Sequence, residues 1–151
     1  ATDRKPPMSP TVSPAPALAA QALTSPASLR GAAQAAAARG EPLVVMTTLS
    51  GCPYCDLVRN HHLLPMRREG KVQAVQIDIR DRSSNLQGFR GENTTPAEQA
   101  RQWNARFAPT VLFLGPDGQE LAERLVGVAV ADFYGDYLDA RLKEARSKLP
   151  R

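Results

Sequence analysis

The only two cysteines of the chain lie three positions apart, where a predicted strand gives way to a predicted helix. Cys52 and Cys55 enclose Pro53 and Tyr54, and the largely apolar segment 42–49 comes directly before them. This arrangement predicts a dithiol/disulfide redox centre. It also restricts the fold to one in which a buried strand leads straight into the amino end of a helix.

The two cysteines are expected to have different roles. Several backbone N–H groups at the start of a helix lack partners and the helix dipole is positive there, so a thiolate is favoured at Cys52. Cys55 lies about one helical turn further on, close enough to attack a mixed disulfide formed at Cys52. We therefore predict that Cys52 is the nucleophile and Cys55 the resolving thiol. Pro53 suits a first helical turn, and Tyr54 is expected beside the sulfurs.

Two other interpretations of the cysteine pair are a metal site and inert packing. A structural zinc site usually takes four cysteine or histidine ligands. The only histidines, His61 and His62, follow on the same predicted helix without finger-like spacing. We therefore expect neither a metal nor a cofactor.

The bulk properties of the chain indicate a single globular domain. Its length of 151 residues suits one domain with a core, and no apolar run approaches the about 20 residues of a membrane span. The net charge of +4 comes from lysines and arginines that are interleaved with acidic residues. This pattern is typical of a solvated surface, so no nucleic-acid partner is expected. A monomer is expected.

The first residues suggest a flexible leader. The chain starts at Ala1, and six of its 13 prolines fall within the first 26 positions. Residues 1–24 are predicted to form a disordered tether and residues 25–149 a folded domain. A protein exported and trimmed after a small residue would begin in this way, as would a chain shortened artificially. We expect a periplasmic protein.

Sequence patterns predict the order of the secondary structure. A helix is expected from Ser25 to Arg39, a strand over 43–48, a helix from the cysteine motif to a break or kink at Pro65, and a strand over 72–79. A polar loop over 81–94, a helix over 95–104 and a hairpin of two strands over 110–126 should follow. The last helix, about 130–148, should turn Phe133, Tyr137, Leu138 and Leu142 inward. By the crossover rule, this order gives a parallel pair of strands joined to an antiparallel pair.

Three segments of the sequence resemble the signature blocks of the thioredoxin superfamily in order and spacing. They are residues 44–55, 107–118 and 125–142, and the resemblance extends over about residues 26–148. It implies an α/β fold, the thioredoxin fold, with a central mixed four-stranded sheet flanked by helices. It also implies that Pro109 is a cis-proline, that Ala108 and Pro109 form a substrate-facing loop, and that Gly127 lies near the same groove. Simple turn geometry is the other interpretation of Gly127.

The sequence departs from the family pattern in two places. The buried carboxylate that the family commonly has six positions before the first cysteine would fall on Met46. The segment 81–94 makes the region before Pro109 longer than in minimal thioredoxins. It is either a partner-recognition loop or a tolerated surface insertion.

The chain most resembles bacterial exported thioredoxin-like proteins, including those that keep cytochrome c or sulfur-oxidation components reduced. The resemblance implies a periplasmic thiol–disulfide oxidoreductase that acts on disulfides of protein partners and is recycled by a membrane or small-thiol reductant. The Cys-Pro-Tyr-Cys motif is similar to that of glutaredoxins, but the glycines and aspartate that hold glutathione are not evident after Gly118. A glutathione-linked enzyme is one alternative, and a copper-binding module of the same fold is another.

Overall fold

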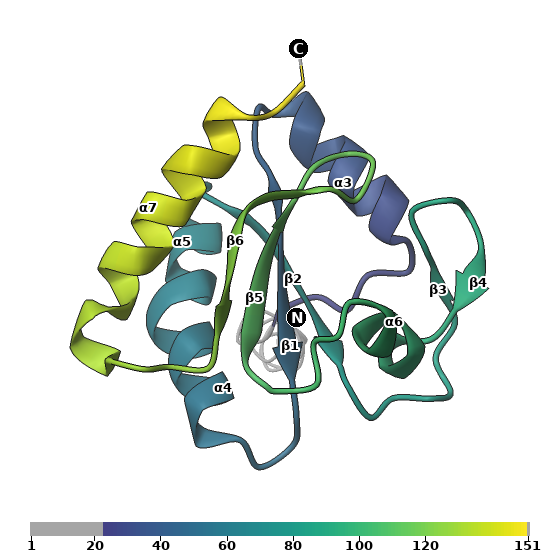
Figure 1. The fold of residues 1–151 in the computed structure, drawn as a ribbon, viewed down its shortest axis with the longest axis horizontal. Helices are drawn as coiled ribbons and strands as arrows, with labels where there is room; N and C mark the ends of the chain where they lie inside the picture. Colours follow the sequence, from purple (N-terminus) through teal and green to yellow (C-terminus); the bar gives the residue numbers. More distant parts are fainter. Residues whose placement is uncertain (1–22, 151) are drawn as a thin grey trace, which may run out of the picture.

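A mixed four-stranded sheet forms the centre of the computed structural model, which describes residues 23–150. Its strands are β1 (Leu43–Thr48), β2 (Gln73–Asp78), β5 (Thr110–Leu114) and β6 (Glu120–Val126), in the order β2-β1-β5-β6 (Figure 1). Strand β1 runs parallel to β2 and antiparallel to β5, and β5 runs antiparallel to β6. The predicted combination of a parallel and an antiparallel pair is confirmed.

Helices cover both faces of this sheet. On one face lie α4 (Pro53–Val58), the π-helical segment η1 (Arg59–Leu63), α5 (Leu64–Arg68) and α7 (Tyr134–Ser147). On the other lie α3 (Leu29–Ala38) and α6 (Pro96–Gln102). Alternate residues of β1 therefore enter two separate cores: Val44 and Met46 face the first group, Leu43 and Val45 the second. All six residues of β1 are buried, as predicted for a strand covered on both faces.

The helix that begins at the cysteine motif does not end at Pro65. It passes through η1, where the Leu64 N–H bonds to the Arg59 carbonyl oxygen five residues back, and continues in α5 to Arg68. Pro65 has no N–H to donate and its ring would crowd the preceding turn of an α-helix. The wider π turn accommodates the proline, so the helix continues past it without a break. None of the helices within residues 23–150 is long and apolar enough to cross a bilayer.

The amino-terminal side of the fold differs from the prediction. Helix α3 begins after Ser28, whose side chain accepts a hydrogen bond from the Gly31 N–H at 2.9 Å, and not at Ser25. Leu23 is 3% exposed, and the Thr24 carbonyl oxygen accepts the Gln76 N–H at 3.0 Å at the outer edge of β2. The packed domain thus includes two residues that we assigned to the tether. The rest of the tether, 1–22, lies outside the described residues.

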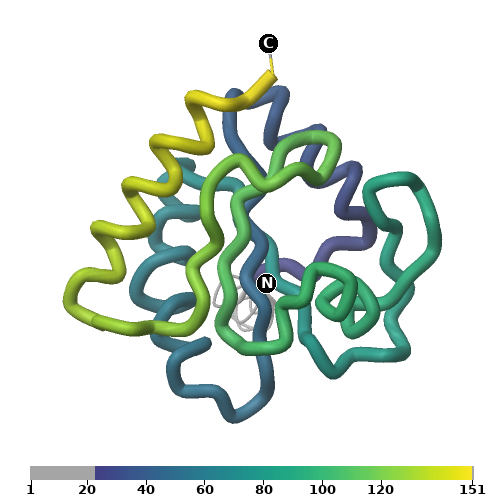
Figure 2. Tube along the Cα trace, in the orientation of Figure 1, coloured from purple at the N-terminus to yellow at the C-terminus, as the bar shows by residue number. Residues whose placement is uncertain are grey.

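The segment predicted to be a polar loop contains a short hairpin, β3 (Leu86–Gln87) with β4 (Asn93–Thr94). Leu86 is 2% exposed, and the Gln87 N–H donates to the Ala27 carbonyl oxygen just before α3. Phe89 at the hairpin turn packs near Trp103, with 6.5 Å between the ring centroids. Figure 2 shows this part of the trace leaving β2, passing beside α3 and returning to α6. The hairpin is therefore a packed part of the second core.

The last helix buries a different stripe from the one predicted. A 3-10 turn, η2 (Ala131–Phe133), comes first, and α7 starts at Tyr134. Leu138 and Leu142 are buried as expected, but Phe133 is 54% and Tyr137 42% exposed. The buried stripe consists of Tyr134, Leu138, Leu142 and Ala145, at intervals of three or four residues, which turns Phe133 and Tyr137 away from the sheet.

Candidate active site around the disulfide

Cys52 and Cys55 form a disulfide at the start of α4, with 5.2 Å between their Cα atoms. Cys52 is the N-cap residue, in extended conformation, and its Sγ accepts a hydrogen bond from the Cys55 N–H at 3.2 Å. Pro53 occupies the first helical position, where its missing N–H would have had no partner. The predicted transition from strand to helix at the motif is confirmed.

The two sulfur-bearing residues differ in accessibility. Cys55 is fully buried, whereas Cys52 is partly exposed. Tyr54, between them in sequence, is 56% exposed. Since a partner can approach only an accessible sulfur, Cys52 is the residue that can meet another molecule.

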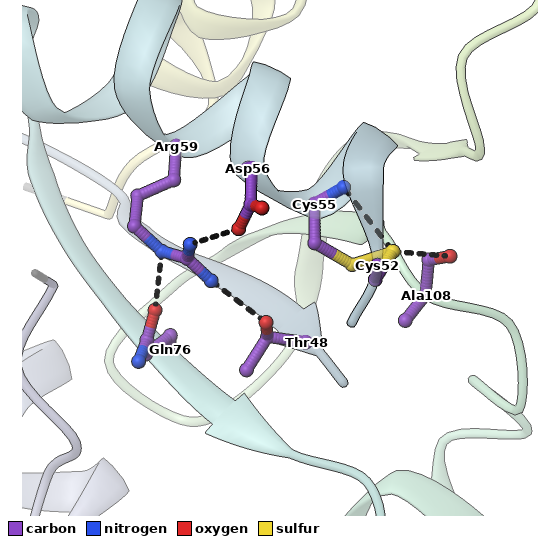
Figure 3. Close-up of polar contacts among 7 residues, drawn as sticks. All are labelled: Thr48, Cys52, Cys55, Asp56, Arg59, Gln76 and Ala108. Atoms are coloured by element: carbon purple, nitrogen blue, oxygen red, sulfur yellow. Dashed lines mark hydrogen bonds and ion pairs between the residues drawn. A yellow bond between two sulfur atoms is a disulfide. The ribbon is translucent and has the colours of Figure 1, made fainter. Parts of the chain in front are cut away.

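The loop before β5 stands opposite the disulfide. The Ala108–Pro109 peptide bond is cis, as predicted. The Ala108 carbonyl oxygen lies 3.6 Å from Cys52 Sγ, on the side of the sulfur away from the helix (Figure 3). A backbone acceptor and the exposed sulfur therefore share one surface.

A buried hydroxyl group in β1 holds this loop. Thr47 Oγ1 accepts the Thr110 N–H at 2.7 Å and donates to the Phe107 carbonyl oxygen at 3.1 Å. Thr110 Oγ1 donates to the same carbonyl oxygen at 2.6 Å. These bonds join the strand that precedes the cysteines to both ends of the segment containing Ala108 and Pro109. The sequence analysis missed Thr47, since no local pattern marks a threonine within an apolar strand as a loop anchor.

Gly127 closes the other side of the loop. Its N–H donates to the Pro109 carbonyl oxygen at 2.7 Å, and its φ of 66° lies in the left-handed region that favours glycine. Backbone geometry alone thus accounts for a glycine here. Its placement beside Pro109 agrees with the expected position near the groove, and direct contact with a substrate stays a prediction.

Arg59 links the active-site helix to the sheet. Its guanidinium donates to Asp56 at 2.9 Å, to Gln76 in β2 at 2.9 Å and to Thr48 at the end of β1 at 2.7 Å (Figure 3). The side chain is only 14% exposed. The sequence analysis did not identify Arg59. The spacing of four residues from Cys55, which places both on one helix face, could have identified it.

The position that the family gives to a buried carboxylate is apolar here. Met46 is fully buried and belongs to the same apolar core as Val58 and Phe113. Within residues 23–150, no group of three or more histidine, cysteine or acidic side chains is placed to hold a metal ion. The two sulfurs of Cys52 and Cys55 are the reactive groups that the structure places at this site.

Exposed apolar side chains stand beside the predicted site residues. Phe107, immediately before Ala108, is 73% exposed, and Val126, immediately before Gly127, is 56% exposed. With Tyr54 they form what we call the apolar rim. Exposed apolar groups gathered at one place are typical of a surface that binds another protein. The sequence analysis identified only Tyr54, although the other two directly adjoin residues that it did identify.

Comparison with known proteins gives consistent results. Residues 29–141 match the family model described as thioredoxin-like domain. Among solved structures, thioredoxin of Fasciola hepatica is 16% identical with a TM-score of 0.53, and the match covers 82% of this chain and 99% of that one. Oxidised mitochondrial thioredoxin 3 of Saccharomyces cerevisiae is 18% identical with a TM-score of 0.52, covering 81% and 94%. A poplar thioredoxin h mutant is 14% identical with a TM-score of 0.55, covering 85% and 95%.

A search of curated protein sequences found no significant match. The structural matches are remote in sequence but cover most of each chain, so they bear on the arrangement of the elements. The thioredoxin fold expected from the resemblance is confirmed.

Proposed function

Because the chain belongs to the family of thioredoxin-like domains and is an oxidoreductase with a redox-active Cys-X-X-Cys disulfide, we propose that it reduces or exchanges disulfides of protein partners in the bacterial periplasm. One observation carries the proposal. The accessible Cys52 Sγ lies between the Cys55 N–H and the Ala108 carbonyl oxygen, while Cys55 is fully buried behind it. This geometry suits an attacking sulfur in front and a resolving sulfur behind.

In the first step, the reduced chain attacks a disulfide of its partner. The thiolate of Cys52 forms a bond to one partner sulfur, the partner disulfide breaks, and the second partner sulfur leaves with the electron pair. The Cys55 N–H and the amino end of the helix favour negative charge on Cys52 before the attack. The product is a mixed disulfide at the protein surface.

In the second step, Cys55 releases the partner. Its sulfur loses a proton and attacks Cys52 Sγ, and the remaining partner sulfur leaves as a thiolate that takes up a proton. The chain ends as the Cys52–Cys55 disulfide, and the partner has gained two electrons and two protons. We propose a membrane-bound or small-thiol reductant for the return to the dithiol.

The substrate-facing residues of the proposal are Pro53, Tyr54, Ala108, Pro109 and Gly127. Ala108 offers its carbonyl oxygen next to the sulfur, where an extended partner backbone can donate an N–H. Tyr54 contributes apolar surface between the cysteines. Phe107 and Val126 extend this surface on both sides, so a protein segment fits better than a small thiol.

The periplasmic part of the proposal is supported by the proline-rich composition of the first 26 residues and by the resemblance to exported thioredoxin-like proteins. A fusion of the full gene product to a reporter enzyme that is active only outside the cytoplasm tests it. Reporter activity is expected. An inactive reporter would contradict export.

The chemical part of the proposal is tested with two cysteine variants. Cys52→Ser should abolish reduction of a protein disulfide by dithiothreitol-fed enzyme. Cys55→Ser should also impair turnover, and once it has been reduced and freed of dithiothreitol it should accumulate a mixed disulfide with the partner, detectable as a larger species on non-reducing gels. Full turnover by Cys52→Ser, or trapping by Cys52→Ser instead of Cys55→Ser, would refute the assigned roles.

A further inference from the structure

A second surface feature lies at the same edge of the sheet as the disulfide. It is an open pocket of about 840 Å³ between the end of β2 and helix α6. Arginine side chains and an apolar floor line this pocket, which we call the arginine groove. Its lining includes Ile79, Arg80, Arg82, Glu98, Arg101 and Arg106. Its volume is in the range of about 300–1,000 Å³ that is usual for ligand pockets.

The charges of the arginine groove are unbalanced. Both oxygens of Glu98 accept hydrogen bonds from Arg101, so these two side chains neutralise each other. Arg80, Arg82 and Arg106 are exposed, and their guanidinium groups have no hydrogen-bond or ion-pair partner within residues 23–150. Three positive charges thus face one open pocket.

Two acidic residues nearby have other partners. The Asp78 carboxylate accepts the Arg80 backbone N–H, and the Asp81 carboxylate accepts the backbone N–H groups of Ser83 and Ser84. The hydrogen bonds from Ser84 and Ser83 lower the pKa of Asp81 to about 2, and they hold its carboxylate within the turn. Neither carboxylate lines the groove.

The arginine groove adjoins the disulfide site through two segments. Arg106 lies two residues before Ala108, and two residues span at most about 7 Å. Arg80 lies two residues after Asp78, which pairs with Thr48 at the end of β1. Since β1 leads to Cys52 and β2 leads to Arg80, both features sit at the carboxyl ends of neighbouring parallel strands (Figures 1 and 2). The groove therefore lies within reach of a chain that binds along Phe107 and Ala108.

We propose that the arginine groove binds an acidic segment of the partner protein next to the cysteine that reacts with Cys52. The proposal rests on the proposed function, since it names the class of disulfide substrate. Planar guanidinium side chains bind carboxylates through two parallel hydrogen bonds, and the apolar floor favours a peptide over a free anion. Charge complementarity at this place selects the partner and speeds its encounter with the site.

The test measures peptide binding without redox chemistry. Three labelled peptides carry serine in place of the reactive cysteine, flanked by acidic, amide or basic residues, and fluorescence anisotropy reports their affinity for the oxidised full chain. The acidic peptide should bind about tenfold more tightly than the amide peptide at about 0.05 M salt, given three exposed charge pairs. The difference should nearly vanish at about 1 M salt, where screening is strong.

Arginine variants assign the effect to the groove. Arg80→Gln, Arg82→Gln and Arg106→Gln combined should remove the preference for the acidic peptide, and all three side chains are exposed, so the fold is kept. Arg30→Gln, Arg39→Gln and Lys143→Gln combined are the matched control, because they also remove three exposed positive charges and lie on α3, at its end and on α7, outside the groove. Equal affinities for the acidic and amide peptides, or a preference that the control removes equally, would overturn the proposal.

A second readout separates this proposal from the proposed function. Reduction of bis(2-hydroxyethyl) disulfide, which is uncharged, should proceed equally with the wild-type chain and the triple variant. If that reduction is normal but peptide binding shows no charge preference, the groove proposal fails and the proposed function stands. If the acidic peptide is preferred but Cys52→Ser reduces disulfides as well as the wild type, the groove stands and the assigned chemistry fails.

Discussion

Replacing Thr47 with valine should loosen the loop that holds Pro109 over the disulfide. The hydroxyl of Thr47 is the acceptor for the Thr110 N–H at 2.7 Å and a donor to the Phe107 carbonyl oxygen. The Gly127 N–H bonds to Pro109 on the β6 side of the loop, so by the alternation of an antiparallel ladder the Thr110 N–H points toward β1. The hydrogen-bond acceptor that β1 offers to the Thr110 N–H is the Thr47 side chain.

The expected loss of stability in Thr47→Val follows from the lost hydrogen bond between the Thr110 N–H and Thr47 Oγ1, which no other group replaces. Valine keeps the shape of threonine but leaves the Thr110 N–H unsatisfied in a site where Thr110 is 1% exposed. An unsatisfied buried donor costs about 1–3 kcal/mol. The Phe107 carbonyl oxygen keeps its bond from the Thr110 hydroxyl at 2.6 Å, so its loss is small. We expect the free energy of unfolding to fall by about 2 kcal/mol.

Urea unfolding measures this change, and Thr47→Ser is the matched control. Serine keeps the hydroxyl and loses one methyl group, which should cost about 1 kcal/mol through packing alone. The two variants should then separate in activity. Thr47→Val should lower kcat/KM for a protein disulfide severalfold because the Ala108 carbonyl oxygen is less well placed, whereas Thr47→Ser should stay close to the wild type.

Two results would refute this reasoning about Thr47. One is a valine variant whose free energy of unfolding lies within about 0.5 kcal/mol of the wild type, the usual range for a neutral surface change. The other is a serine variant that loses as much kcat/KM as the valine variant. In the first case the hydrogen bond between Thr47 and Thr110 makes no net contribution to the free energy of unfolding. In the second case the methyl group of Thr47, and not its hydroxyl group, positions the loop.

Other parts of the site give further predictions. Arg59→Met should lower the free energy of unfolding in urea by about 2 kcal/mol, since a mostly buried guanidinium loses three hydrogen bonds, whereas Asp56→Asn should change it by less than about 1 kcal/mol. Burial lowers the pKa of His62 below 6.5, so the unfolded chain binds this proton more tightly than the folded chain. The free energy of unfolding should therefore rise with pH up to about 6.5. His62→Gln should flatten this dependence on pH, and an unchanged dependence would contradict its assignment to His62. Phe107→Ser should raise KM for a protein disulfide severalfold while leaving the urea midpoint unchanged, because the side chain is 73% exposed. An unchanged KM would show that Phe107 does not contribute to binding of the protein partner.

The parts of the structure that the sequence predicted well are those decided by neighbours along the chain. An apolar run of strand length, followed by the cysteine motif with proline in its second position, is enough to place β1 and the start of α4. The resemblance added the cis bond at Ala108–Pro109, which no periodicity could supply. These local signals locate both sulfurs and the loop that faces them.

The sequence-based expectations are wrong where contacts between residues far apart in the chain determine the local structure. Ser25 and Ser28 are equally good N-caps by residue type, and the choice of Ser28 goes with its bond to Gln87, 59 positions away. Leu86 is one apolar residue in a polar segment, and its burial against α3 makes a hairpin from a predicted loop. Arg59 and Thr47 escaped notice for the same reason, since both act by joining segments that the sequence keeps apart.

The absence of the family carboxylate changes how the second step must work. Cys55 is fully buried, and so is Met46 at the position of that carboxylate; such surroundings favour a neutral thiol. The buried polar residues within 23–150 are three threonines and one glutamine, so no buried acid in that region can take the proton of Cys55. The proton of Cys55 must then go to an accessible group of the chain, to solvent or to the partner. The departing partner thiolate is released at Cys52, which is accessible, so the partner itself can accept the proton that resolution sets free.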